Sequence, residues 1–184
     1  MIVRTAALYF LYALVSVNCD NTKFPDYYWR EYNGNIPHDA IPGGLDQEAN
    51  PTYIGQVYLG KTGLLPATIK QGFNSALTSA GGKTIEAKQI ENIKILCSSD
   101  QSKLKWVTTR CEDKRLFNGN CHVVNGGSEG GQIVHIGRTC HDSQIIIGRV
   151  FSFYEHWRGL WIPHNGGNTH FWPYEILTFD CNDV

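Results

Sequence analysis

The sequence contains one pattern written twice, over residues 34–97 and again over residues 119–181. The closing segments match best, because the same kinds of residue recur at the same spacing in Glu91, Ile93, Ile95 and Cys97 and in Glu175, Leu177, Phe179 and Cys181. Double glycines mark further equivalent positions, at residues 43–44 and 126–127 and at residues 81–82 and 166–167. A match spread over several blocks predicts an internal repeat of one unit of about 65 to 80 residues.

Each copy has the pattern of short β-strands joined by tight turns. Residues 53–58 and 134–139 carry β-branched and aromatic side chains at strand spacing. Glycine is frequent, at 19 residues, and only 18% of the residues are charged, which favours strands and turns over long helices. The sequence therefore predicts an all-β fold, a sandwich or a barrel-like domain. Because each copy is small for independent stability, we expect both to share one core.

The charge and the first segment bear on partners and location. The formal net charge of -1 provides neither the basic field of a nucleic-acid-binding protein nor a polybasic membrane patch. Residues 1–19 combine a short basic start, an apolar run and small residues, the pattern of a secretory signal peptide. The apolar run is too short for a membrane span, which needs about 20 residues. We therefore expect a secreted, extracellular protein, with repeat 1 over residues 20–97 and a linker and repeat 2 over residues 98–184.

Secretion would leave five cysteines in the mature chain: Cys97, Cys111, Cys121, Cys140 and Cys181. In an oxidising compartment cysteines favour disulfides over metal ligation. Because five is an odd number, we expect one thiol to be free, buried or paired between chains. The sequence does not determine which cysteines pair. Four of them lie between residues 97 and 140, so we expect the bridges to pin the second copy and the linker before it.

The motifs of both copies resemble the DM9 domain family. Residues 34–46 read GNIPHDAIPGGLD and match the family pattern Gly-x-Ile-Pro-x-x-Ala-(Val/Ile)-x-Gly-Gly-x-Asp at every fixed position. Shorter family blocks stand at residues 53–56, 136–138, 147–150 and 174–177. The resemblance implies tandem DM9 repeats with pseudo-twofold symmetry, intertwined strands and, in many members, a homodimer. It also implies a function, because some members are lectins that bind mannose-type sugars as pattern-recognition proteins of innate immunity.

The resemblance assigns a ligand-binding role to four positions. In lectin-like members, the acid after Gly-Gly and the lysine of a Pro-Gly-Lys motif hold the sugar hydroxyls. The acid corresponds to Asp46 and Glu129, and the basic residue corresponds to Thr68 and Arg149. A carboxylate accepts hydrogen bonds from adjacent hydroxyls, and a cation donates to the same oxygens. Because the first copy has threonine in place of the cation, we expect Glu129 and Arg149 to form the better site and Asp46 to be a remnant.

Metal binding and catalysis have weaker support. The histidines gather near His135 and His141 and near His164 and His170, without a tight His-x-His or His-x-x-x-His pair, so we expect no metal and no other cofactor. The sequence has no Gly-x-Ser-x-Gly elbow, phosphate loop or dinucleotide fingerprint, so we expect no enzyme. The acids after the double glycines stand in different copies, which predicts two separate sites rather than one glycosidase pair.

A second function stays open on the same scaffold, that of a secreted interaction protein that binds a protein partner and no sugar. The candidates for an aromatic platform against a sugar or a protein are Trp157, Trp161, Phe171 and Trp172. Packing between sheets is the commoner use of such side chains, and we expect it also of Trp29 and Trp106, which begin the two copies.

Overall fold

The computed structural model describes residues 26–109, 122–151 and 158–181. Over these ranges antiparallel strands join in one 15-stranded sheet, which confirms the all-β prediction. Helix in the described ranges is limited to the short 3-10 turns η1 (Ile90–Asn92) and η2 (Gln101–Lys103). The first half contains β1 (Tyr27–Glu31), β2 (Pro42–Leu45), β3 (Pro51–Tyr58), β4 (Gly63–Lys70), β5 (Ala76–Ala80), β6 (Lys83–Ala87) and β7 (Ile93–Ser98). The second half contains β8 (Leu104–Thr109), β9 (His122–Val123), β10 (Asn125–Glu129), β11 (Gln132–His141), β12 (Gln144–Phe151), β13 (Gly159–His164), β14 (Gly167–Phe171) and β15 (Tyr174–Phe179).

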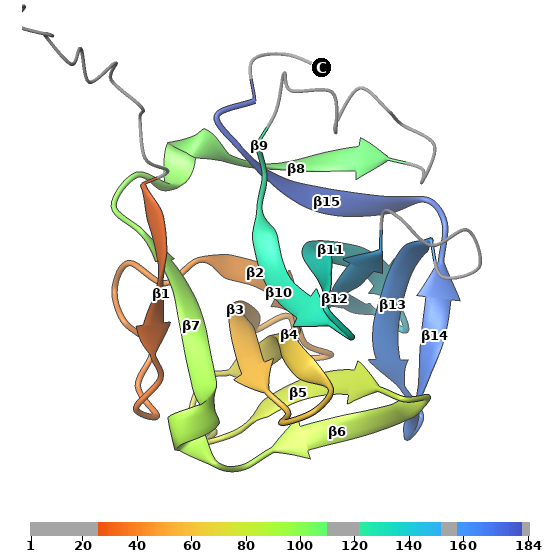
Figure 1. The fold of residues 1–184 in the computed structure, drawn as a ribbon. Coiled ribbons are helices and arrows are strands. Elements are labelled where there is room, and N and C mark those ends of the chain that lie inside the picture. Colours follow the sequence, from red (N-terminus) through yellow and green to blue (C-terminus); the bar gives the residue numbers. More distant parts are fainter. Residues whose placement is uncertain (1–25, 110–121, 152–157, 182–184) are drawn as a thin grey trace, which may run out of the picture.

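The strand pairings of the first half recur in the second half (Figure 1). β3 pairs with β4, and β11 pairs with β12 in the same way. The hairpin β5–β6 extends β4, as the hairpin β13–β14 extends β12. β7 pairs with β3 and β1, as β15 pairs with β11 and β8. An internal repeat predicts this recurrence, while the domain boundaries expected from the sequence stay predictions, and the signal peptide expected over residues 1–19 lies outside the described residues.

Each half gives one strand to the other. β2 pairs with β3 of its own half and with β12 of the second half, where Leu45 faces Ile145. β10 pairs with β11 and, on its other side, with β4 of the first half. β3, β2, β12, β11, β10 and β4 therefore form a closed ring of paired strands, to which each half contributes three. The ring is the barrel-like, intertwined arrangement that the sequence led us to expect.

The double glycines before the predicted acids lie where the exchanged strands meet the other half. A Cβ atom on Gly44 would lie 2.1 Å from the carbonyl oxygen of Ile145. A Cβ atom on Gly127 would lie 2.0 Å from the carbonyl oxygen of Leu64. No side chain fits at these distances, so glycine at both positions permits the close backbone approach that exchange of strands requires.

The two halves share one hydrophobic core. Fully buried aliphatic side chains from both halves form one cluster, which includes Ile54, Leu96, Ile136, Ile147 and Leu177. Trp29 and Trp106 pack against this cluster, which confirms the packing role expected of them. A buried hydrogen bond of 2.8 Å also joins the halves, from Nε2 of Gln56 to the carbonyl oxygen of Gly126. Burial of each large aliphatic side chain contributes about 1.5–3 kcal/mol, so each half is stabilised by contact with the other.

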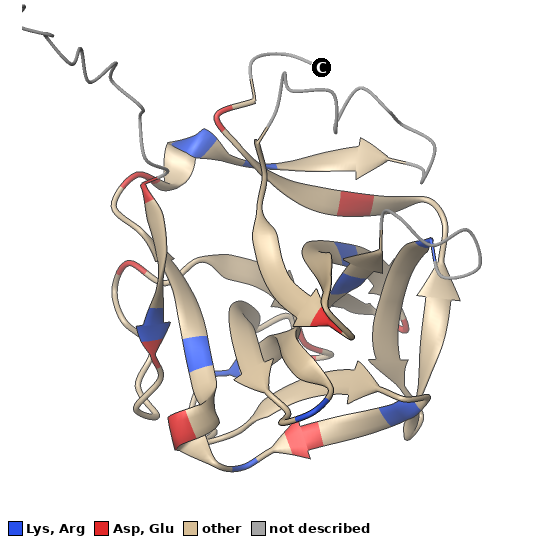
Figure 2. Cartoon of the chain, viewed as in Figure 1, with Lys and Arg blue, Asp and Glu red and all other residues tan. Residues whose placement is uncertain are grey.

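Charged residues of both signs are spread over the described part of the chain (Figure 2). This distribution agrees with the net charge of -1. In the described ranges, none of the helices has the length and apolar character needed to span a bilayer.

Two cysteines are free thiols, Cys97 on β7 and Cys140 on β11. The expectation of a single unpaired thiol was therefore wrong. The two thiols are not placed to form a disulfide with each other, because Cys97 is buried in the core and Cys140 is exposed. Cys181 is disulfide-bonded, and Cys111 and Cys121 lie outside the described residues.

We expect iodoacetamide to alkylate Cys140 and to leave Cys97 unmodified in the native protein at pH 8. Burial, together with the neighbouring Asp39, raises the pKa of the Cys97 thiol to about 11, so the reactive thiolate is scarce there. Mass spectrometry of the digested protein measures both sites. Alkylation in urea is the control, since unfolding should make the two thiols equally reactive. Rapid native modification of Cys97 would contradict its placement in the core.

Candidate functional site

Glu129 and Arg149 lie against each other, as the predicted acid–base pair requires. Nε of Arg149 is 2.8 Å from Oε2 of Glu129, and the two side chains are 3% and 20% exposed. Nη1 of Arg149 also donates to Oγ of Ser79, at 2.8 Å, and to the main-chain carbonyl of the same residue. Ser79 belongs to β5 of the first half. The guanidinium is therefore turned into the interface between the halves, where protein groups use its charge and donors.

Burial dominates the electrostatics of this pair. It raises the pKa of the Glu129 carboxyl above its usual value, and the charge of Arg149 offsets only part of the rise. Burial likewise lowers the pKa of the Arg149 guanidinium, with Glu129 acting in the opposite direction. For both groups, the free-energy cost of removing the charge from water therefore exceeds the free energy gained from their mutual attraction. This is common in buried ion pairs. Either charge left alone in this place would be strongly unfavourable.

The carboxylate of Asp46 is used by its own loop. Oδ1 accepts hydrogen bonds from the main-chain N–H groups of Glu48, at 3.1 Å, and Asn50, at 2.8 Å. Burial by itself would raise the pKa of Asp46, but these hydrogen bonds and the charge of Lys70 lower it below its usual value. The carboxylate therefore stays ionised and fixes the shape of the loop over residues 46–50.

A polar cleft of about 200 Å³ lies beside this loop, between the two halves. Thr52, Thr68 and Lys70 line it from the first half, and Gln144 and Asn165 line it from the second. The Oγ1 atoms of Thr52 and Thr68 are buried and make no hydrogen bond to any residue in the described part of the chain. The apolar wall consists of Leu45, Leu77, Ile145, Ile146 and Pro163.

The cleft of the first half lies at the position that corresponds to the Arg149 side chain in the second half. Thr68 stands opposite Ile54 in the register of β3 and β4. Arg149 stands opposite Ile136 in the same register of β11 and β12. The two positions are therefore equivalent, as the sequence motif predicts. Because threonine is much shorter than arginine, the space beside it stays open.

Lys70 is a residue that the sequence analysis missed. It follows Thr68 by two positions on β4, so both side chains lie on one face of the strand and line the same cleft. Its ammonium is close enough to Asp46 to lower the pKa of that carboxyl. The cation missing from the family motif in the first half thus has a substitute two residues farther along the strand. The alternation of side chains along β4 was the signal that could have identified it.

Comparison with known proteins places this architecture in a family. The family model described as the DM9 repeat matches residues 57–171. The chain belongs to the DM9 family. Among curated proteins no relative matched the sequence. Among solved structures, the nematode sperm cell motility protein MFP2B is similar, with a TM-score of 0.63 and 14% sequence identity over 86% of this chain and 47% of that chain. This DM9 chain therefore spans about half of MFP2B, and at such identity the likeness concerns the fold alone.

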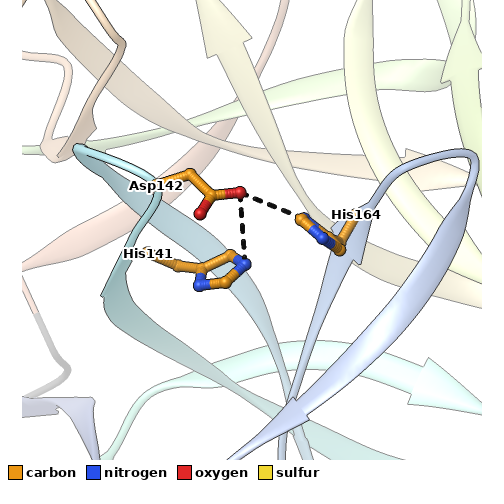
Figure 3. Close-up of side chains that lie close together, drawn as sticks. All are labelled: His141, Asp142 and His164. Atoms are coloured by element: carbon orange, nitrogen blue, oxygen red, sulfur yellow. Dashed lines mark ion pairs between the residues drawn. The ribbon is translucent and has the colours of Figure 1, made fainter.

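Three side chains of the types that can bind a metal ion also meet in this DM9 fold, at His141, Asp142 and His164 (Figure 3). Oδ2 of Asp142 lies 3.4 Å from Nε2 of His141 and 3.7 Å from Nδ1 of His164. In the sequence, the two histidines stand in separate groups. The other members of those groups do not join the cluster: Nδ1 of His135 lies 3.2 Å from a main-chain carbonyl oxygen, and His170 packs elsewhere.

The aromatic residues considered as a platform are mostly packed. Trp161 and Trp172 both pack against His170, with ring centroids 4.9 and 5.5 Å from the imidazole. Phe171 packs against the core of the second half, while Trp172 is 41% exposed. Trp157 lies outside the described residues. In the described part of this DM9 chain, packing is therefore the main role of these side chains.

Proposed function

We propose that this DM9 protein is a lectin-like carbohydrate-binding protein whose sugar site is the cleft lined by Thr52, Thr68 and Lys70. One observation carries the proposal, namely that threonine side chains, an ammonium group and apolar walls line one cleft. A sugar ring offers hydroxyls to the polar groups and C–H faces to the apolar ones. A hydrogen bond from the ammonium group of Lys70 to a sugar hydroxyl would be worth about 1.5–3 kcal/mol, because the donor is charged.

The size of the cleft limits the ligand to about one sugar unit. Pockets for drug-sized ligands measure roughly 300–1,000 Å³, and this cleft measures about 200 Å³. The family resemblance suggests a mannose-type sugar as the unit. The sequence pattern of residues 1–19 supports a secreted protein, so the proposed role is extracellular pattern recognition.

The role proposed is binding and not catalysis. Glycoside hydrolysis needs two carboxyl groups on either side of one bond. Asp46 is held by the main chain of its own loop, and Glu129 is held by Arg149. Neither carboxyl is available as an acid or a nucleophile toward a ligand in the cleft.

We expect Lys70→Gln to weaken binding of a mannose-type oligosaccharide by about 10- to 100-fold, because a hydrogen bond from a charged donor is worth about 1.5–3 kcal/mol. A glycan array run with the wild-type protein identifies the sugar, and titration calorimetry then measures the affinities of wild type and variant. Lys88→Gln is the matched control. The Lys88 side chain is 74% exposed, pairs with Glu86 and lies outside the cleft, so the affinity should not change.

Absence of any glycan binding by the wild-type protein would contradict the proposal, and so would equal losses in the Lys70 and Lys88 variants. A protein partner is then the second candidate function. Among the described residues, Tyr58 and Phe73 are the most exposed large hydrophobic side chains, at 54% and 56%, so they are the contacts to test for a protein partner. Alanine at both positions should leave glycan binding intact and weaken only capture of a protein.

A further inference from the structure

Two β-hairpin turns place His141, Asp142 and His164 at one edge of the second half (Figure 3). The turn between β11 and β12 has positive φ at Asp142 and Ser143, and the turn between β13 and β14 has positive φ at Asn165 and Gly166. Both are therefore two-residue turns of the kind that joins twisted strands, and each histidine is the last strand residue before its turn. Because β12 and β13 are antiparallel neighbours, the start of one and the end of the other lie side by side.

The distances between the three side chains match a first coordination shell. Zinc binds histidine nitrogen at about 2.0–2.1 Å and carboxylate oxygen at about 2.0–2.2 Å, so neighbouring ligand atoms of a tetrahedral site lie about 3.4 Å apart. Oδ2 of Asp142 is 3.4 Å from Nε2 of His141 and 3.7 Å from Nδ1 of His164. All three ligand atoms lie within 4.8 Å of one another, so small side-chain rotations complete the arrangement.

A second observation points to a ligand at this place. Nε2 of His141 is buried and makes no hydrogen bond to any described residue, although a buried polar atom normally has a partner. Nε2 of His164 lies 2.8 Å from the side-chain amide nitrogen of Asn165. Rotation of the Asn165 amide by 180° would place its oxygen there, to accept a hydrogen bond from Nε2–H of His164. His164 would then present its Nδ1 lone pair toward Asp142, as histidines that bind metals do.

We propose that His141, Asp142 and His164 bind one zinc ion. Two imidazoles and one carboxylate favour zinc and similar transition metals over Ca²⁺ and Mg²⁺, which prefer oxygen ligands. Three protein ligands leave the fourth position of a tetrahedral site to an exchangeable group. Asp142 and His164 also line the cleft described above, so this fourth position lies near its rim.

The site is confined to the second half. Ala80 ends β5 as His164 ends β13, and each stands opposite the first residue of the following strand. The first half therefore has a methyl group where the second half has an imidazole. We expect one zinc ion per chain for this reason, although the chain contains two copies of the unit.

Titration calorimetry of the full chain with ZnCl2 at pH 7.5, after treatment with EDTA and without a polyhistidine tag, tests the proposal. We expect one ion per wild-type chain, and at least about tenfold weaker binding by Asp142→Asn and by His164→Gln. His38→Gln, at an exposed histidine outside the cluster, should bind like wild type. Cys140→Ser should also bind like wild type, because neighbours on a strand point to opposite faces.

Thermal unfolding separates loss of a ligand from loss of the fold. In EDTA the Asp142→Asn and His164→Gln variants should melt near the wild-type temperature, and ZnCl2 should raise the melting temperature of the wild type but not of these two variants. Cobalt bound to the wild type should give visible absorption bands that these variants lack. Failure of the wild type to bind zinc, zinc binding by both variants at wild-type affinity, or loss of binding in Cys140→Ser would overturn the proposal. No sugar is present in these experiments, so their outcome is independent of the proposed lectin function.

Discussion

Replacement of Arg149 by methionine is expected to lower the free energy of unfolding by about 3–5 kcal/mol, because it leaves the Glu129 charge buried without its partner. The methionine would keep much of the apolar volume, so the effect comes from charge and hydrogen bonding. The change also removes the donors to Ser79, which join the second half to the first. Urea denaturation followed by circular dichroism measures the loss.

Two comparisons sharpen this prediction. Lys94→Met breaks the ion pair with Glu31, in which the two side chains are 41% and 69% exposed, and should change stability little. The double variant Glu129→Leu/Arg149→Met should recover most of the stability that Arg149→Met loses, since apolar replacement of a buried pair is often neutral. Equal losses from Lys94→Met and Arg149→Met would show that Arg149 is not buried against Glu129.

Gly44→Ala is expected to cost at least about 3 kcal/mol, because overpacking at a backbone contact forces the strands apart. The new Cβ would lie 2.1 Å from the carbonyl oxygen of Ile145, and a main-chain atom cannot rotate away as a side chain can. Gly127→Ala should cost at least as much, because its Cβ would lie 2.0 Å from a carbonyl oxygen and its φ is +138°. Thermal and urea unfolding measure both variants.

Gly167→Ala is the control for these glycines. It also lies in a strand, but the nearest atom to its new Cβ would be 3.4 Å away, and its φ is not in the left-handed region. We expect a change in stability well below that of Gly44→Ala. If all three variants unfold alike, the exchanged strands do not approach the other half as closely as described.

The repeat, the strand content and the shared core could be predicted from the sequence, because they depend on local spacing and composition. The alternation around Ile93 and around Leu177 is local, and it places apolar side chains on one face of a strand. The exchange of β2 and β10 could not be predicted in this way. It depends on which distant strand edges meet, and glycine spacing alone indicates a close approach without naming the partner.

The candidate site followed the sequence in part. The motif identified Thr68 and Arg149 as equivalent, and it brought Glu129 and Arg149 together as expected. It did not indicate that the arginine would be turned toward Ser79, because that contact joins β12 to a strand of the other half. The ligand-binding role of the four motif residues stays a prediction. The open cleft beside Thr68 favours a binding site in the first half over one at Glu129 and Arg149.

The histidine cluster could not be predicted from the sequence, because it too depends on contacts between distant strands. His141 and His164 stand in separate hairpins, and only the pairing of β12 with β13 brings their turns together. A search for metal ligands at close spacing along the chain therefore misses them.

The most direct test of the proposed sugar site is a ¹H–¹⁵N NMR titration of the protein with methyl α-mannoside. We predict that amide shifts change around Thr68, Lys70 and Gln144, which line the cleft, and that those of Glu129 and Arg149 stay in place. Shifts centred on Glu129 and Arg149, or no shifts at all, would contradict the central claim that the first-half cleft is the binding site.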